Sequence, residues 1–202
     1  MKLKNFQLLL FILTISGCMN IGFKQPEIEY YILNYNIIND SREKLPVNLN
    51  IDYFTISPIY STNKFIFKKD NFRIEEDFYN RWITDPDKLL YDFVKKDFLK
   101  HNLLLIDNSE SNYQNYKLKG HINEIYGHIT EDNLYAILSI NFSLYKYDKK
   151  NNDYNLIFNK IYTHKTKTSQ IKINSFVHSM SKNMKIISED LINDVYNNIK
   201  GH

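Results

Sequence analysis

The feature that most restricts the fold of this sequence is a regular alternation of apolar and polar residues in its C-terminal half. Every second residue is apolar over 134–144, and a shorter alternation covers 116–122. Neighbouring side chains of a strand point to opposite faces, so this period of two predicts strands with one buried face. A polar turn over 148–153 leads to a further strand over 154–166. The three segments together predict an antiparallel meander.

The N-terminal half carries shorter strand signals. Residues 28–35 are rich in β-branched and aromatic side chains, and 47–53 alternate, so each segment predicts one strand. Residues 64–77 predict a hairpin that turns at Asp70, because aspartate suits turn positions. The apolar segment 103–107 predicts one more short strand.

Two amphipathic helices complete the predicted domain. The first begins at Asp85-Pro86, because aspartate is a good N-cap and proline loses no hydrogen bond at the first helical position. The second carries apolar residues in steps of three and four, with Asn174 as its expected N-cap and Gly201 as its terminator. We therefore expect an α+β, two-layer domain: a mostly antiparallel sheet of about six to eight strands with two main helices packed on one face.

The first residues have the pattern of an export signal. Lys2 and Lys4 precede an apolar run over 6–15. This run is shorter than the roughly 20 residues that a permanent membrane span needs. It predicts a cleaved signal peptide over residues 1–17. The sequence ISGC that ends at Cys18 is similar to the lipobox of bacterial lipoproteins and predicts lipidation of Cys18; the alternative is a plain signal peptide with an incidental cysteine.

Cleavage before Cys18 would leave 185 residues (202 − 17). We expect a lipidated tether over 18–27 and one domain over 28–202. Cys18 is the only cysteine in the sequence, so no intrachain disulfide can form. By resemblance to outer-membrane lipoproteins, Met19 after the lipidated residue favours the outer membrane, with the domain facing the periplasm.

Composition argues against two classes of ligand. The formal charge of +3 falls to +1 without Lys2 and Lys4, so no basic surplus is left to attract nucleic acid. Gly120 and Gly127 are the only glycines between residues 28 and 200. Without a glycine-rich loop, the chain has no phosphate-binding motif for a nucleotide.

Several short segments, in their order along the chain, resemble one known family, the ABC-type transport auxiliary lipoproteins (PqiC-like). These segments are Tyr30-Tyr31-Ile32-Leu33, Ile56-Ser57-Pro58-Ile59-Tyr60, Arg81-Trp82, Leu118-Lys119-Gly120-His121-Ile122 and Ser175-Phe176-Val177. The resemblance implies a non-enzymatic auxiliary component of a system that moves lipids or other hydrophobic molecules between the inner and outer membranes. Its implied partners are an MCE-domain protein or transporter subunits, with lipid cargo and a homo-oligomer as open alternatives.

Two other functions remain open at this point. The first is an outer-membrane assembly lipoprotein that supports a lipopolysaccharide-export or other β-barrel. The second is a periplasmic hydrolase, which is disfavoured because no nucleophile and base can be placed together. We expect no catalytic, cofactor-binding or metal site. His121 and His128 are seven residues apart, which places them on opposite faces of a regular strand.

The family segments also supply the candidate contact residues Tyr30, Tyr31, Leu33, Arg81 and Trp82. Tryptophan and arginine are frequent at binding hot spots. The alternative, which we favour, is that Trp82 packs against the first helix while Arg81 pairs with an acidic residue among 75–77. Met180 and Met184 continue the stripe of the second helix and are expected in the core, although an exposed stripe would suit an apolar ligand.

Overall fold

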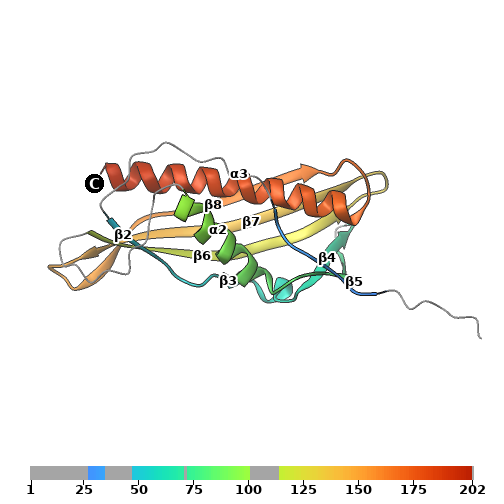
Figure 1. The fold of residues 1–202 in the computed structure, drawn as a ribbon, viewed down its shortest axis with the longest axis horizontal. Helices are drawn as coiled ribbons and strands as arrows, with labels where there is room; N and C mark the ends of the chain where they lie inside the picture. Colours follow the sequence, from blue (N-terminus) through green and yellow to red (C-terminus); the bar gives the residue numbers. More distant parts are fainter. Residues whose placement is uncertain (1–26, 35–46, 71, 101–113, 202) are drawn as a thin grey trace, which may run out of the picture.

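The computed structural model of the protein describes residues 27–34, 47–70, 72–100 and 114–201. These residues form an eight-stranded sheet with two α-helices packed on it, which confirms the predicted α+β class (Figure 1). The strands are β1 (Glu29–Tyr31), β2 (Val47–Ile51), β3 (Thr55–Ile56), β4 (Lys64–Lys69), β5 (Arg73–Trp82), β6 (Gln114–Ile129), β7 (Leu134–Asp148) and β8 (Asp153–Lys167). The helices are the short 3-10 helix η1 (Pro58–Tyr60), α2 (Pro86–Lys100) and α3 (Ile173–Lys200). The predicted strand over 103–107 lies outside the described residues.

The predicted meander is the centre of the sheet. β6, β7 and β8 pair antiparallel in sequence order, and each is longer than its alternating core predicted. Tight turns join them, and Asn152 in the β7–β8 turn takes a positive φ of 53°. Among the described strands, none pairs with the outer edge of β8.

The other edge of β6 is lined by three successive strands, β2, β3 and β4. All three run parallel to β6, aligning Leu49 with Tyr116, Thr55 with His121 and Phe67 with Gly127. β5 then returns antiparallel to β4, and β1 adds parallel to the end of β5. The sheet is therefore mixed outside its meander.

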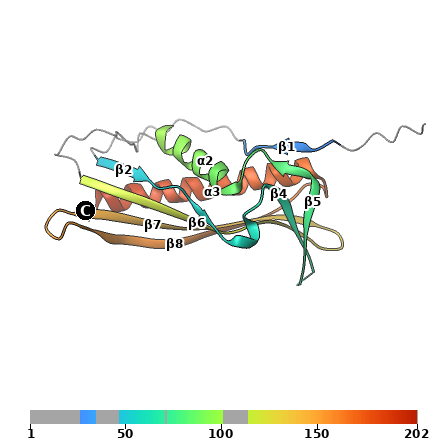
Figure 2. The same ribbon diagram turned by 90° about the horizontal axis from the view of Figure 1, so that it is seen from below.

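The segment around β1 differs from its prediction. The strand covers only residues 29–31, because the chain then leaves the sheet and crosses α3 (Figures 1 and 2). Leu33 is buried, and the Asn34 amide donates to Ser181 Oγ of α3 at 3.1 Å. The crossing segment thus gives up strand pairing for contacts with the helix, and the first part of α3 lies between it and the sheet.

The β4–β5 hairpin forms where the sequence predicts it. Asp70 takes a left-handed φ of 55°, and its carboxylate accepts from the amides of Phe72 and Arg73 at 3.0 and 3.1 Å. β5 continues to Trp82, beyond the predicted end of the hairpin at residue 77.

The core lies between the sheet and α3. Met180 and Met184 are both 0% exposed, which confirms their core position and removes the exposed-stripe alternative.

Two glycines of β6 allow phenylalanine rings to pack directly against the backbone of the sheet. A Cβ on Gly120 would lie 2.7 Å from Phe54 Cδ1, and one on Gly127 would lie 2.5 Å from Phe67 Cε1. Only glycine fits under these rings without a shift of the core.

Both helices begin within two residues of the predicted positions. α2 starts at Pro86, and Asp85 forms an ion pair with Lys88 at 2.9 Å. The predicted N-cap of α3 is wrong by two residues: the cap is Lys172, whose carbonyl accepts from the Phe176 amide at 3.0 Å, and Asn174 already lies inside the helix. Gly201 is the C-cap, as predicted.

One polar contact joins the helices inside the core. Asp97 of α2 is 1% exposed, and its carboxylate accepts a hydrogen bond from Ser188 Oγ of α3. Asp97 was not singled out from the sequence.

Candidate contact surfaces

The two family segments that supplied the candidate contact residues lie side by side in the structure. β1 pairs with the end of β5, which aligns Tyr30 with Arg81 and Tyr31 with Trp82. The Ile83 amide then donates to the Tyr31 carbonyl at 2.9 Å, so the ladder extends one residue past β5. Residues about fifty positions apart in sequence (81 − 30 = 51) thus form one structural unit.

The members of this unit divide between its two faces. Tyr31, Leu33 and Trp82 point toward α3 and the core, and Trp82 is only 2% exposed. The Trp82 ring lies 4.5 Å from Phe65 of β4 and 6.2 Å from Phe176 of α3, measured between centroids. Trp82 is therefore a packing residue, as favoured, and its ring packs on Phe176 of α3, a helix that the prediction did not name.

Tyr31 closes the inner face at the start of the domain. Burial, together with a hydrogen bond from its hydroxyl to the Glu29 carboxylate, raises the pKa of Tyr31 to about 12. The phenol is therefore neutral at physiological pH and acts as a donor. Its ring centroid lies 5.4 Å from that of Phe65, which continues the aromatic cluster around Trp82.

The outward face of the unit is apolar and exposed. Tyr30 is 54% exposed, and its alternating neighbours Ile28 and Ile32 are 41% and 55% exposed. Ile83, bonded beside them through its amide, is 54% exposed. We call these four residues and Arg81 the tether-side patch. Sequence reasoning selected Tyr30 and Arg81 but missed the isoleucines, although the alternation of 28, 30 and 32 was a usable signal.

Arg81 does not form the predicted pair with the acidic residues 75–77. Glu75 binds Lys69 at 2.6 Å, Glu76 binds Lys64 at 2.5 Å, and Asp77 accepts from the Tyr79 and Asn80 amides. Within the described part of the chain, no acidic side chain pairs with Arg81, and its buried Nε has no hydrogen-bond partner. The prediction failed because the β5 carboxylates are bound by other donors, which are two lysines of β4 and the backbone amides of Tyr79 and Asn80.

His121 and His128 lie on the same face of β6, which corrects the predicted opposite placement. The register of β6 against β7 shifts between residues 122 and 124, so the alternation resets between the two histidines. His121 Nδ1 lies 2.7 Å from Thr55 Oγ1 and has a hydroxyl partner. Among the residues that the structure describes, no group of three or more His, Cys, Asp or Glu side chains could hold a metal ion.

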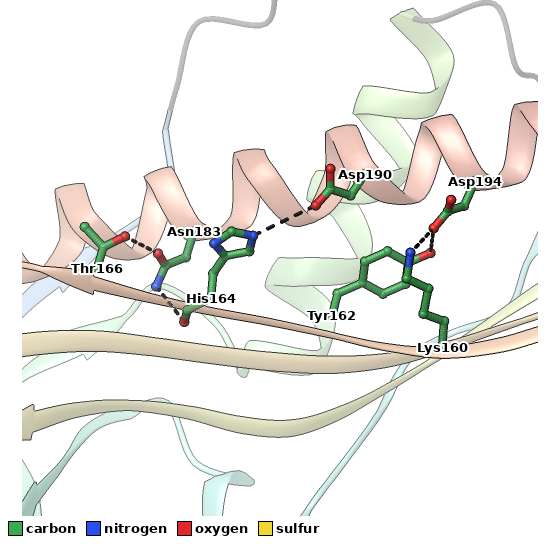
Figure 3. Close-up of polar contacts among 7 residues, drawn as sticks. All are labelled: Lys160, Tyr162, His164, Thr166, Asn183, Asp190 and Asp194. Atoms are coloured by element: carbon green, nitrogen blue, oxygen red, sulfur yellow. Dashed lines mark hydrogen bonds and ion pairs between the residues drawn. The ribbon is translucent and has the colours of Figure 1, made fainter.

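A row of polar contacts links β8 to α3 (Figure 3). Asn183 is fully buried: its Nδ2 donates to the carbonyls of Ala136 and His164 at 2.9 and 3.3 Å, and its Oδ1 accepts from Thr166 Oγ1 at 2.5 Å. Further along α3, His164 Nε2 lies 3.9 Å from the Asp190 carboxylate. The row fixes the register of the helix on the strand.

At the end of this row, Asp194 receives two donors. Lys160 Nζ and the Tyr162 hydroxyl lie 2.6 and 2.7 Å from the same carboxylate oxygen. Burial opposes ionisation, but these hydrogen bonds and the lysine charge outweigh it and hold the pKa of Asp194 below its ordinary value. Burial and the bond to Asp194 raise the pKa of Tyr162 well above its usual range. The arrangement satisfies an ionised carboxylate and a neutral phenol, so it stabilises the helix–strand contact.

One open cavity of about 320 Å³ lies beside the first turn of α3. Its apolar walls are formed by Phe67, Ile129, Leu134, Ile171 and Ile173, and charged residues of β4 and β5 border it. It is continuous with solvent, and Lys172 adds a charged group from the N-terminal end of α3.

Cys18 and the tether up to residue 26 lie outside the described residues, so the predicted lipidation stays a prediction. No helix among the described residues has the length and apolar character to cross a membrane.

Comparison with known proteins extends the fold assignment. No family model and no curated protein matches this chain. Among solved structures, protein XCC0632 from Xanthomonas campestris, of the family DUF330, is similar with a TM-score of 0.73 and 11% identity, over 86% of this chain and 97% of that one. An uncharacterised protein has a TM-score of 0.63 at 10% identity, over 84% and 99% of the two chains. The hypothetical protein CT253 from Chlamydia trachomatis has a TM-score of 0.53 at 7% identity, over 78% and 100%. Identities this low show a shared fold alone.

Proposed function

We propose that the protein is a lipoprotein anchored through Cys18 in the outer membrane, facing the periplasm. It serves there as a non-enzymatic auxiliary component of an MCE/ABC-type system that transports lipids or other hydrophobic molecules between the two membranes. The observation that carries the proposal is the position of the only cysteine, at the end of a lipobox-like sequence and ten residues before the first described apolar side chain (28 − 18 = 10).

Two structural features support the proposal. The segments that resemble the transport auxiliary lipoproteins at Tyr30–Leu33 and Arg81–Trp82 pair with each other, as parts of one architectural unit would. The described polar clusters also have structural partners. One Asp194 oxygen accepts from Lys160 and Tyr162, and His121 lies within hydrogen-bond distance of the Thr55 and Ser57 hydroxyls.

A protein held at one membrane must reach its partners through exposed surface. Among the described strands, none pairs with the outer edge of β8, and the side chains of Leu156 and Ile161 on this strand are exposed. Such edges accept a strand or a loop from another chain. We place the docking site for an MCE-domain protein or a transporter subunit on this edge.

The anchor is tested by growing cells with radiolabelled palmitate and comparing wild type with Cys18→Ser. Label on the wild type alone supports the anchor, because serine cannot form the thioether. An unlabelled wild-type protein contradicts it.

The partner is tested by placing a photo-crosslinking amino acid at Ile161 in intact cells, with a matched position at Tyr53, which is 78% exposed and lies away from β8. We expect an MCE-domain protein or transporter subunit to be captured from Ile161 and not from Tyr53. Capture of a β-barrel from Ile161 would favour the assembly-lipoprotein alternative. No specific product from Ile161 would refute the assigned edge.

A further inference from the structure

We infer that the tether-side patch rests on the phospholipid surface of the membrane that holds the anchor. The inference builds on the proposed lipid anchor and adds a second, non-covalent contact that orients the domain. It concerns the outward side chains of Ile28, Tyr30, Ile32 and Ile83 together with Arg81.

The first argument is reach. Ile28 lies ten positions after Cys18, and a fully extended chain over these positions spans at most about 35 Å. Helix α3 has 28 residues and is about 42 Å long. The tether is therefore shorter than the domain, and it keeps the end that carries β1 within about 35 Å of the bilayer. The β7–β8 turn lies at the opposite end, near the C-terminus of α3 (Figure 2).

The second argument is the apolar character of the patch. Three isoleucines and one tyrosine are each more than 40% exposed on one short segment of the surface. Transfer of an isoleucine side chain out of water is favourable, and tyrosine is enriched at the boundary between headgroups and acyl chains. Burial of these side chains at the interface would add to the membrane affinity of the acyl chains on Cys18 and would favour one orientation of the domain.

The third argument is charge. Tyr30, Arg81 and Lys64 are aligned across β1, β5 and β4, which places a guanidinium between the tyrosine and a lysine that is bound to Glu76. Arg81 has no acidic partner among the described side chains, and arginine donates well to phosphate. Glu29 alternates to the other face, where it contacts Tyr31. The outward face therefore offers a cation to the phosphate layer beside apolar groups for the acyl layer.

The experiment places a fluorescent reporter in the patch. Tyr30→Trp is compared with Tyr154→Trp at the opposite end, and the signal of the buried native Trp82 is subtracted with the wild type. Each protein is purified from cells, where it is acylated under the proposed function, and reconstituted into vesicles of phosphatidylethanolamine and phosphatidylglycerol. A portion of the lipids carries bromine in the acyl chains, which quenches nearby tryptophan.

A parallel sample keeps this test separate from the test of acylation. The chain beginning at Cys18, which contains every described residue, is coupled through its only thiol to a maleimide lipid in the same vesicles. If cells do not acylate Cys18, the proposed function fails, while the coupled sample still tests the patch.

We expect a blue shift and a loss of emission for Tyr30→Trp and neither for Tyr154→Trp. Ile83→Glu, added to Tyr30→Trp, should abolish the quenching, whereas the matched Leu99→Glu, at an exposed apolar position on α2, should leave it unchanged. Arg81→Gln, added to Tyr30→Trp, should weaken the quenching most in vesicles rich in phosphatidylglycerol. Equal quenching at positions 30 and 154 would overturn the inference. A blue shift of the Tyr30→Trp emission that depends on protein concentration, without quenching by brominated lipid, would assign the patch to a second copy of the chain instead.

Discussion

The amide of Asn183 offers a strong test of the contact between α3 and the sheet. Asn183→Ala removes two donated hydrogen bonds, to the carbonyls of Ala136 and His164, and one bond accepted from Thr166. A neutral hydrogen bond contributes about 1 kcal/mol net, and buried groups left without partners cost more. Since Asn183 is fully buried, we expect the free energy of unfolding to fall by about 2–4 kcal/mol.

The assay is urea unfolding monitored by circular dichroism. An unchanged slope of the unfolding free energy against urea concentration would indicate that the variant keeps the native state. Asn197→Ala on the exposed face of α3 is the control and should change stability by only a few tenths of a kcal/mol. Thr166→Val should cost about 1 kcal/mol, and its effect should shrink in the presence of Asn183→Ala because the two side chains share a bond. A loss for Asn183→Ala no larger than that of the control would refute the assigned role of the buried amide.

Three further predictions concern the core and the helix–strand contact. The ionised form of Asp194 is favoured in the folded protein, so its contribution to stability is complete above its ordinary pKa of 3.8 and is lost as the pH falls through the lower folded-state value. Urea unfolding at several pH values should therefore show an advantage of wild type over Asp194→Asn at neutral pH that shrinks in acid, and a gap independent of pH would contradict this. Gly127→Ala should lower stability by about 1–3 kcal/mol because its Cβ meets the Phe67 ring, and Phe67→Leu in the same chain should recover part of the loss in thermal melts. Trp82→Ala should cost about 3–5 kcal/mol, while Phe78→Ala, at an exposed ring on the same strand, should cost little; similar losses would show that Trp82 is not a core residue.

The C-terminal half of the fold could be predicted well because its signals are local. Alternation over 134–144 requires one buried face, and the antiparallel hairpins need only short turns. The same reasoning placed the start of α2 at Pro86, where capping chemistry and proline agree. The cap of α3 was misplaced, since Lys172 caps through its backbone and carries no side-chain signal. The faces of His121 and His128 were also wrong, because the sequence does not show the bulge between them.

The N-terminal half was less predictable because its partners are distant in sequence. Nothing in residues 47–69 shows that they run parallel to β6, and nothing in 28–35 shows that the chain leaves the sheet to cross α3. The same limit applies to the candidate contact residues. Tyr30 and Tyr31 are identical neighbours in sequence, yet one is exposed and one packs on Phe65, because the pairing with Arg81 and Trp82 decides which face each occupies.

The parallel alignment of β2, β3 and β4 along β6 has a consequence for the order of folding. Thr55 and His121 pair across 66 positions (121 − 55), whereas β6 to α3 assembles from consecutive elements. Distant pairings are slow to form because a long loop must close first. We expect pulsed hydrogen exchange during refolding to protect amides of β7 before those of β2. The edge that forms late is also the one next to the proposed anchor at Cys18, so a chain exported as proposed would complete its sheet only after β6 to α3 have crossed the membrane.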